Sequence, residues 1–185
     1  MPDNLTISDA KGIDPLTFFY KRADLPPIIT EPVVGEEMPE PYKTLLVHDH
    51  DMTPTLEAHH GENMYLFVLD QDRDNTTCAR QVVLLGENSE RPAEFGAIYI
   101  NMEPLPGPAR ALVARGHKPL GGILAEYEIP HKGAPKSYCK VQADETIKEA
   151  LQLEPDQEYT LYGRRNQLLM ENGALLAEVV EILPP

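Results

Sequence analysis

The sequence predicts one α+β domain built on an antiparallel sheet of six strands flanked by short helices. Three β-rich runs, at 64–70, 77–85 and 93–100, are separated by Asp, Asn, Gly and Ser, which favour turns. Two longer runs near the end of the chain flank Asn172-Gly173, and Asn-Gly is a strong signal for a hairpin turn. Because the strands mostly follow one another with few helices between them, an antiparallel arrangement is expected.

The first 41 residues are predicted to form a proline-rich arm that packs on a body at 42–185. Prolines interrupt the arm repeatedly, as in Leu25-Pro26-Pro27, and proline favours extended backbone over helix. Two short helices should follow, one at 42–48 and one that starts near Met52, where Thr53 and Pro54 suit a cap and a first turn.

Local signals define the elements between the β-rich runs and the final hairpin. Residues 107–115 predict a helix that ends at Gly116, a residue that favours the left-handed backbone of a helix C-terminus. We expect strands at 123–129 and 138–143. Asp144 should then cap a helix over 145–151, and the hairpin strands should run over 159–170 and 174–182.

Composition limits the partners and the compartment of the protein. The chain has 185 residues and a net charge of −14, which disfavours nucleic acids and anionic membranes as partners. No apolar stretch approaches the roughly 18 residues that a membrane-spanning helix needs, and the N-terminus lacks the apolar segment of a secretory signal. Two distant cysteines, Cys78 and Cys139, are interpreted as buried thiols. We therefore expect a cytoplasmic protein without membrane insertion.

No motif for nucleotide binding, serine hydrolysis or zinc peptidase chemistry occurs in the chain. The histidine-rich segment His48-Asp49-His50-Asp51, with His59 and His60 nearby, could hold a metal. Its spacing matches no known ligand set, so we interpret it as an exposed helix boundary and predict no metal site. Gly163-Arg164-Arg165 could hold an anion or form a solvated strand edge.

Strand parity singles out two charged residues. Side chains alternate between the two faces of a strand, so Arg80 shares an otherwise apolar face with Cys78, Val82 and Leu84. In the last strand, one face carries Glu178 and the other carries Glu181, and parity alone does not choose between them. A buried arginine is a natural receptor for a carboxylate, and a buried glutamate is a natural proton donor or acceptor. A structural ion pair is the alternative interpretation.

Five motifs give the chain a resemblance to the chorismate lyase family, over about 42–185. They are Asp51-Met52-Thr53, the segment 79–85 (ARQVVLL), Lys118-Pro119-Leu120-Gly121, Tyr162-Gly163-Arg164-Arg165 and Leu175-Leu176-Ala177-Glu178. The order of these motifs, more than any one of them, carries the resemblance. The chain departs from the family at Ala97, where the best-known members have an arginine.

The resemblance implies a six-stranded antiparallel sheet with an enclosed ligand pocket. It implies a lyase that eliminates pyruvate from chorismate to leave 4-hydroxybenzoate, with no cofactor. By motif, Arg80 and Glu178 become the catalytic residues, which also bind substrate, and Met52 and Leu120 become binding residues through their backbone amides. The same fold is similar to effector-binding domains of bacterial transcription regulators. The alternative prediction is therefore a non-catalytic module that binds a small aromatic or carboxylic acid.

Overall fold

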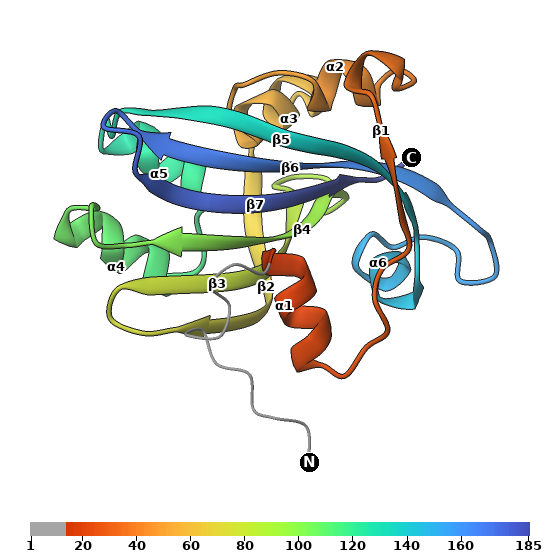
Figure 1. The fold of residues 1–185 in the computed structure, drawn as a ribbon, viewed down its shortest axis with the longest axis horizontal. Coiled ribbons are helices and arrows are strands. Elements are labelled where there is room, and N and C mark those ends of the chain that lie inside the picture. Colours follow the sequence, from red (N-terminus) through yellow and green to blue (C-terminus); the bar gives the residue numbers. More distant parts are fainter. Residues whose placement is uncertain (1–13) are drawn as a thin grey trace.

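The computed structural model describes residues 14–185, and at its centre is one antiparallel sheet of seven strands (Figure 1). Across the sheet the strand order is β1-β5-β6-β7-β4-β3-β2, and every neighbouring pair is antiparallel. The strands are β1 (Thr30–Val33), β2 (Met64–Arg73), β3 (Thr77–Gly86), β4 (Pro92–Asn101), β5 (His131–Gln142), β6 (Thr160–Met170) and β7 (Leu175–Leu183). The predicted α+β class and the antiparallel sheet are confirmed.

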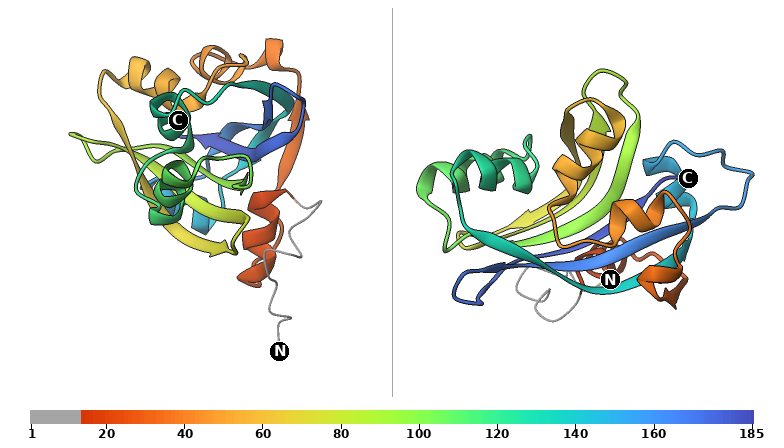
Figure 2. Two further views of the ribbon diagram at one scale, coloured as in Figure 1. Left: turned by 90° about the vertical axis from the view of Figure 1, so that its left-hand side faces the viewer. Right: turned by 90° about the horizontal axis from the view of Figure 1, so that it is seen from above.

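Helices cover both faces of this sheet (Figure 2). One face packs against α1 (Pro15–Arg22) and α6 (Glu145–Ala150). The other face packs against α2 (Tyr42–Leu46), α3 (Met52–His60), α4 (Gly107–Arg115) and α5 (Leu120–Glu126). A short 3-10 helix, η2 (Gly35–Glu37), precedes α2. Because both faces are covered, the central strands bury apolar side chains on both sides, as β3 and β4 do.

The cap, the helix end and the turn that were predicted at Asp144, Gly116 and Gly173 are present in the structure. Asp144 caps α6 by accepting a hydrogen bond from the backbone N–H of Ile147 at 2.9 Å. Gly116 ends α4 with a left-handed backbone at φ 71°, and Gly173 turns the β6–β7 hairpin at φ 81°. At each of these positions the local chemistry and the final fold agree.

The expected count of six strands is wrong, because the proline-rich arm supplies a seventh. Residues 30–33 form β1, which pairs with β5 and places Pro32 opposite Cys139. Proline cannot donate a hydrogen bond to a sheet, but an edge strand such as β1 tolerates it. The division of the chain at residue 41 stays a prediction, and the described part of the arm contributes β1 and α1 to the fold.

The strand expected at 123–129 is also wrong, because this segment lies mostly in helix α5. Leu120, Ile123 and Leu124 are buried and repeat at the three- and four-residue spacing of a helix face. In a short apolar run, periodicity alone cannot distinguish a buried helix from a buried strand. The neighbouring strand β5 begins at His131, well before the expected position 138. None of the helices in residues 14–185 combines the length and the apolar character that crossing a membrane requires.

Candidate functional site

The candidate site lies on the face of the sheet that α3 and α5 cover, where two rows of paired residues cross the strands. In the first row Arg80 of β3 pairs with Ile98 of β4, which pairs with Val179 of β7. In the second row Gly96 of β4 pairs with Glu181 of β7, which pairs with Arg164 of β6. Directly paired residues project to the same face, so both rows face the same helices.

Arg80 is buried, with 1% of its surface exposed, and it has few partners. Its Nη1 donates one hydrogen bond to the carbonyl of Val113 in α4 at 3.2 Å, whereas its Nε has no hydrogen-bond partner in the described part of the chain. No carboxylate of residues 14–185 forms an ion pair with it. Burial lowers the pKa of the Arg80 guanidinium, since a charge without a counterion is poorly stabilised away from water.

A cavity of about 70 Å³ lies against Arg80. Met52 and Leu120, the first residues of α3 and α5, line it together with Arg80. Its lining also includes Glu94, Glu181, Asn166 and the apolar side chains of Val82, Ile98 and Val179. The structure therefore brings together three of the four site residues predicted from the sequence.

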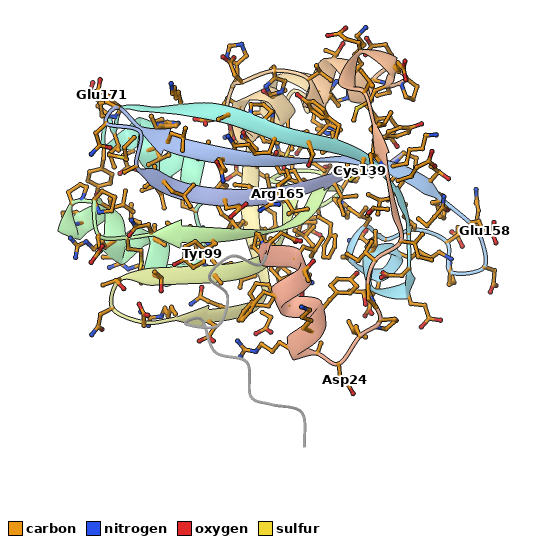
Figure 3. All side chains as sticks on the ribbon, in the orientation of Figure 1. Asp24, Tyr99, Cys139, Glu158, Arg165 and Glu171 are labelled. Atoms are coloured by element: carbon orange, nitrogen blue, oxygen red, sulfur yellow. The ribbon has the colours of Figure 1, made fainter. Side chains whose placement is uncertain are left out.

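Glu178, the fourth predicted site residue, does not lie in this cavity. It pairs with Tyr99 of β4 and Gln167 of β6, in a row that faces the side of α1. There its carboxylate accepts hydrogen bonds from Nε of Arg165, at 2.8 Å, and from Nη2 of the same residue. Arg165, labelled in Figure 3, is half-exposed, so the pair is partly solvated. The glutamate on the same sheet face as Arg80 is Glu181, which strand parity left open and the resemblance set aside.

Two carboxyl groups and one arginine form a buried charge cluster at one side of the cavity. Arg164 donates from Nε to Glu181, and both side chains are almost fully buried. Glu94 of β4 is also buried, and its Oε2 has no hydrogen-bond partner among the described residues. Burial and the nearby Glu181 raise the pKa of Glu94 well above its usual value, against the opposing effect of Arg164. Burial and the neighbouring carboxylate thus favour the protonated form of Glu94.

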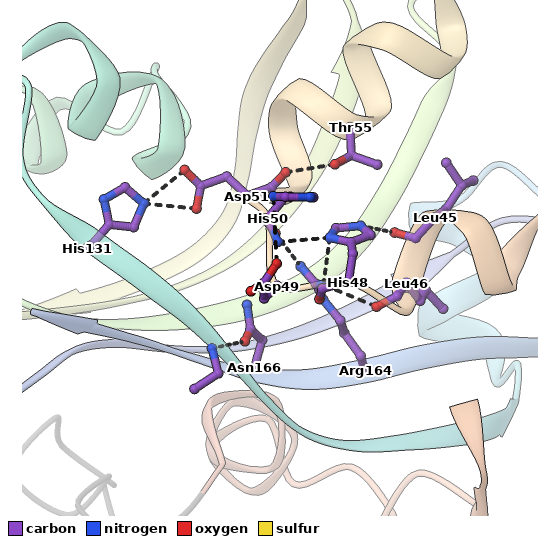
Figure 4. Close-up of polar contacts among 11 residues, drawn as sticks. Leu45, Leu46, His48, Asp49, His50, Asp51, Thr55, His131, Arg164 and Asn166 are labelled. Atoms are coloured by element: carbon purple, nitrogen blue, oxygen red, sulfur yellow. Dashed lines mark hydrogen bonds and ion pairs between the residues drawn. The ribbon is translucent and has the colours of Figure 1, made fainter. Parts of the chain in front are cut away.

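Arg164 also holds the segment that leads into α3 (Figure 4). Its guanidinium donates to the carbonyls of Leu46 at 3.1 Å, His48 at 2.9 Å and His50 at 3.3 Å. These bonds fix the 46–50 segment against β6, next to the cavity. The Gly163-Arg164-Arg165 motif thus divides its two arginines between the two faces of the sheet.

A second contact fastens the same segment to β5. Asp51 lines the cavity, and both of its carboxylate oxygens bind Nε2 of His131, at 3.0 and 2.9 Å (Figure 4). The hydrogen bond to Asp51 raises the pKa of His131. Residues 14–185 contain no group of three or more His, Cys, Asp or Glu side chains placed to hold a metal ion. The 48–51 segment instead uses its polar groups to anchor the start of α3.

A larger cavity, of about 360 Å³, lies on the opposite side of the sheet under α1. Arg164 and Arg165 contribute to its lining, and both are paired with glutamates. The smaller cavity is the better candidate site, because it contains an arginine without a counterion among the described residues.

Sequence reasoning missed Glu94 and Asn166. Alternation along the 93–100 run places Glu94 on the same strand face as Gly96, Ile98 and Ile100. A carboxylate on an otherwise apolar face is the sequence signal that could have identified Glu94 as a site residue. Asn166 is equally buried, and its Oδ1 accepts a hydrogen bond from the backbone N–H of Ala134 in β5 at 3.1 Å.

Among solved structures, PhnF from Mycobacterium smegmatis has a fold similar to that of this chain. PhnF matches with a TM-score of 0.52 at 8% identity, over 74% of this chain and 64% of PhnF. The effector domain of PhnF matches with a TM-score of 0.47 at 10% identity, over 72% of this chain and 87% of that domain.

A ligand-binding domain from Bordetella bronchiseptica, assigned to a GntR-family regulator, matches with a TM-score of 0.49 at 13% identity. That match covers 65% of this chain and 85% of that domain. No protein-family model matches the chain, and no curated protein sequence matches it. The similarity is therefore one of fold.

The expectation that the chain is a chorismate pyruvate-lyase is wrong. The similar structures named above are those of PhnF, of the effector domain of PhnF and of a ligand-binding domain, and no lyase is among these three. The placement of Glu178 agrees with this correction, since the expected catalytic pair of Arg80 and Glu178 is divided between opposite faces of the sheet.

Proposed function

We propose that the chain is a non-catalytic ligand-binding module that holds a small carboxylic acid in the cavity between the sheet and helices α3 and α5. The observation that carries this proposal is Arg80, a buried guanidinium that lines the cavity without a counterion among residues 14–185. A buried charge is costly unless a partner compensates it. A ligand carboxylate would supply that partner and could accept two parallel hydrogen bonds.

The remaining walls suit a small and mostly apolar acid. Val82, Ile98 and Val179 present apolar surface next to the arginine, as in most sites for small organic ligands. A volume of about 70 Å³ holds only a few water-sized groups, which favours a compact ligand. Met52 and Leu120 remain the predicted contacts on the opposite wall.

Binding can be tested by isothermal titration calorimetry with benzoate, pentanoate and chorismate. We expect at least one of these acids to bind, and chorismate to be left intact, with no release of pyruvate. Arg80→Met should weaken binding at least about 30-fold, because losing one partner of a buried charge pair costs roughly 2–5 kcal/mol.

Arg165→Met is the matched control, since Arg165 faces the other side of the sheet and pairs with Glu178. It should leave the affinity unchanged. The proposal fails if no small acid binds the wild-type protein, or if Arg80→Met binds acids as tightly as the wild type does.

A further inference from the structure

Glu94 is a second buried polar side chain with an unpartnered atom in the same cavity. Its Oε2 lacks a hydrogen-bond partner in residues 14–185, as does Nε of Arg80, and both residues line the cavity. A buried polar atom without a partner is unfavourable and uncommon in folded proteins. Because both residues line one cavity, a single ligand bound there would supply partners for both.

The two groups lie at different positions along the strands. Arg80 pairs with Ile98, and Glu94 is four residues from Ile98 on β4. Four residues span roughly 13 Å of strand. Because both side chains are long, the distance between their polar ends can be shorter than this span. In the row between them, Val82 of β3 and Glu181 of β7 lie on either side of Gly96, and both line the cavity. The lining between the two groups therefore combines an apolar side chain with a glutamate that Arg164 already pairs.

The nearby Arg164 makes no hydrogen bond to Glu94, so the Glu94 carboxyl group is available to a ligand. Arg164 directs its Nε to Glu181 and its terminal nitrogens to the carbonyls of Leu46, His48 and His50, and no hydrogen bond joins it to Glu94. Burial and Glu181 raise the pKa of Glu94, which favours its protonated form. A neutral carboxylic acid can both donate and accept a hydrogen bond.

We propose that Glu94 is the second recognition point of the cavity, and that the ligand is a small carboxylic acid with a hydroxyl group remote from its carboxylate. This inference rests on the proposed function, in which Arg80 holds the carboxylate. A hydroxyl suits Glu94 because it, too, both donates and accepts. An ammonium group suits the position less well, since the positive charge of Arg164 already lies beside the two glutamates.

The test measures the preference for a hydroxyl with matched pairs of acids. Benzoate is compared with 4-hydroxybenzoate, and pentanoate with 5-hydroxypentanoate and 5-aminopentanoate, by calorimetry. For the wild type we expect the hydroxylated member of at least one pair to bind about tenfold more tightly, the factor that one net hydrogen bond of roughly 1.4 kcal/mol provides. Glu94→Leu should lose this preference and still bind the parent acid, because Arg80 is intact.

Glu94→Gln is the conservative variant, since its amide also has a donor and an acceptor, and it should keep most of the preference. The inference is overturned if wild-type protein binds each parent acid as well as its hydroxylated partner, or prefers 5-aminopentanoate. It is also overturned if Glu94→Leu keeps the preference. In all three cases binding through Arg80 stands, whereas failure of every acid to bind wild-type protein removes the proposed function itself.

Discussion

Replacing Arg164 with methionine should destabilise the fold far more than replacing its neighbour Arg165. Arg164 is buried and pairs with the buried Glu181, and it also donates to three backbone carbonyls of the 46–50 segment. Methionine preserves much of the volume but removes every donor. Glu181 would then remain buried near Glu94 without its counterion.

The size of the effect follows from burial. Removing one partner of a buried ion pair typically costs 3–5 kcal/mol, so we expect a loss of about 4 kcal/mol. That is a large share of the roughly 5–15 kcal/mol by which domains are stable. The three carbonyls should add less, because His50 is exposed and water can replace the lost donor there. Arg165→Met breaks a partly solvated pair and should cost no more than about 1 kcal/mol.

Equilibrium unfolding in urea, followed by far-UV circular dichroism, measures both variants, since the chain has no tryptophan for fluorescence. With a slope of about 2 kcal/mol/M, the midpoint of Arg164→Met should fall by roughly 2 M. The double variant Arg164→Met with Glu181→Leu should lose less than the sum of the single losses, because the stranded carboxylate is removed. Equal losses for Arg164→Met and Arg165→Met would refute the assignment of Arg164 as a buried anchor.

Two further predictions concern the contacts that hold the 46–51 segment. The hydrogen bond to Asp51 raises the pKa of His131 above its usual value of 6.5. Protonation of the ring therefore stabilises the fold fully below pH 6.5, and this stabilisation is lost as the pH rises through the raised pKa. The difference in unfolding free energy between wild type and His131→Gln should therefore be larger at about pH 6 than at about pH 9, and a constant difference would contradict this. Gly133→Ala should lower the thermal midpoint by several degrees, because its Cβ would lie 2.3 Å from the carbonyl oxygen of Asp49. Gly107→Ala, where no heavy atom lies within 4 Å, should leave the midpoint nearly unchanged, and similar midpoints for the two variants would argue against this close approach.

Much of the secondary structure could be predicted because its causes are local. The Asn172-Gly173 turn, the Asp144 cap and the Gly116 helix end depend on residues a few positions apart. Strand alternation likewise placed Arg80 on an apolar face, which the structure confirms as buried. The segment 123–129 could not be assigned correctly, because its apolar residues are buried by α4 and the sheet, and such contacts leave no local signal.

The sequence by itself determined that β7 carries one glutamate on each face, but not which of them shares a face with Arg80. That choice depends on strand register, since a shift by one residue exchanges the two faces. The pairing of Ile98 with Val179 places Glu181 on the face of Arg80 and leaves Glu178 with Arg165. Only the tertiary structure also brings Glu94 into the cavity, because the cavity is lined by β3 and β4 together with β6 and β7, two pairs of strands that are distant from each other in the sequence. Local chemistry thus decided most of the elements, and long-range pairing decided the site.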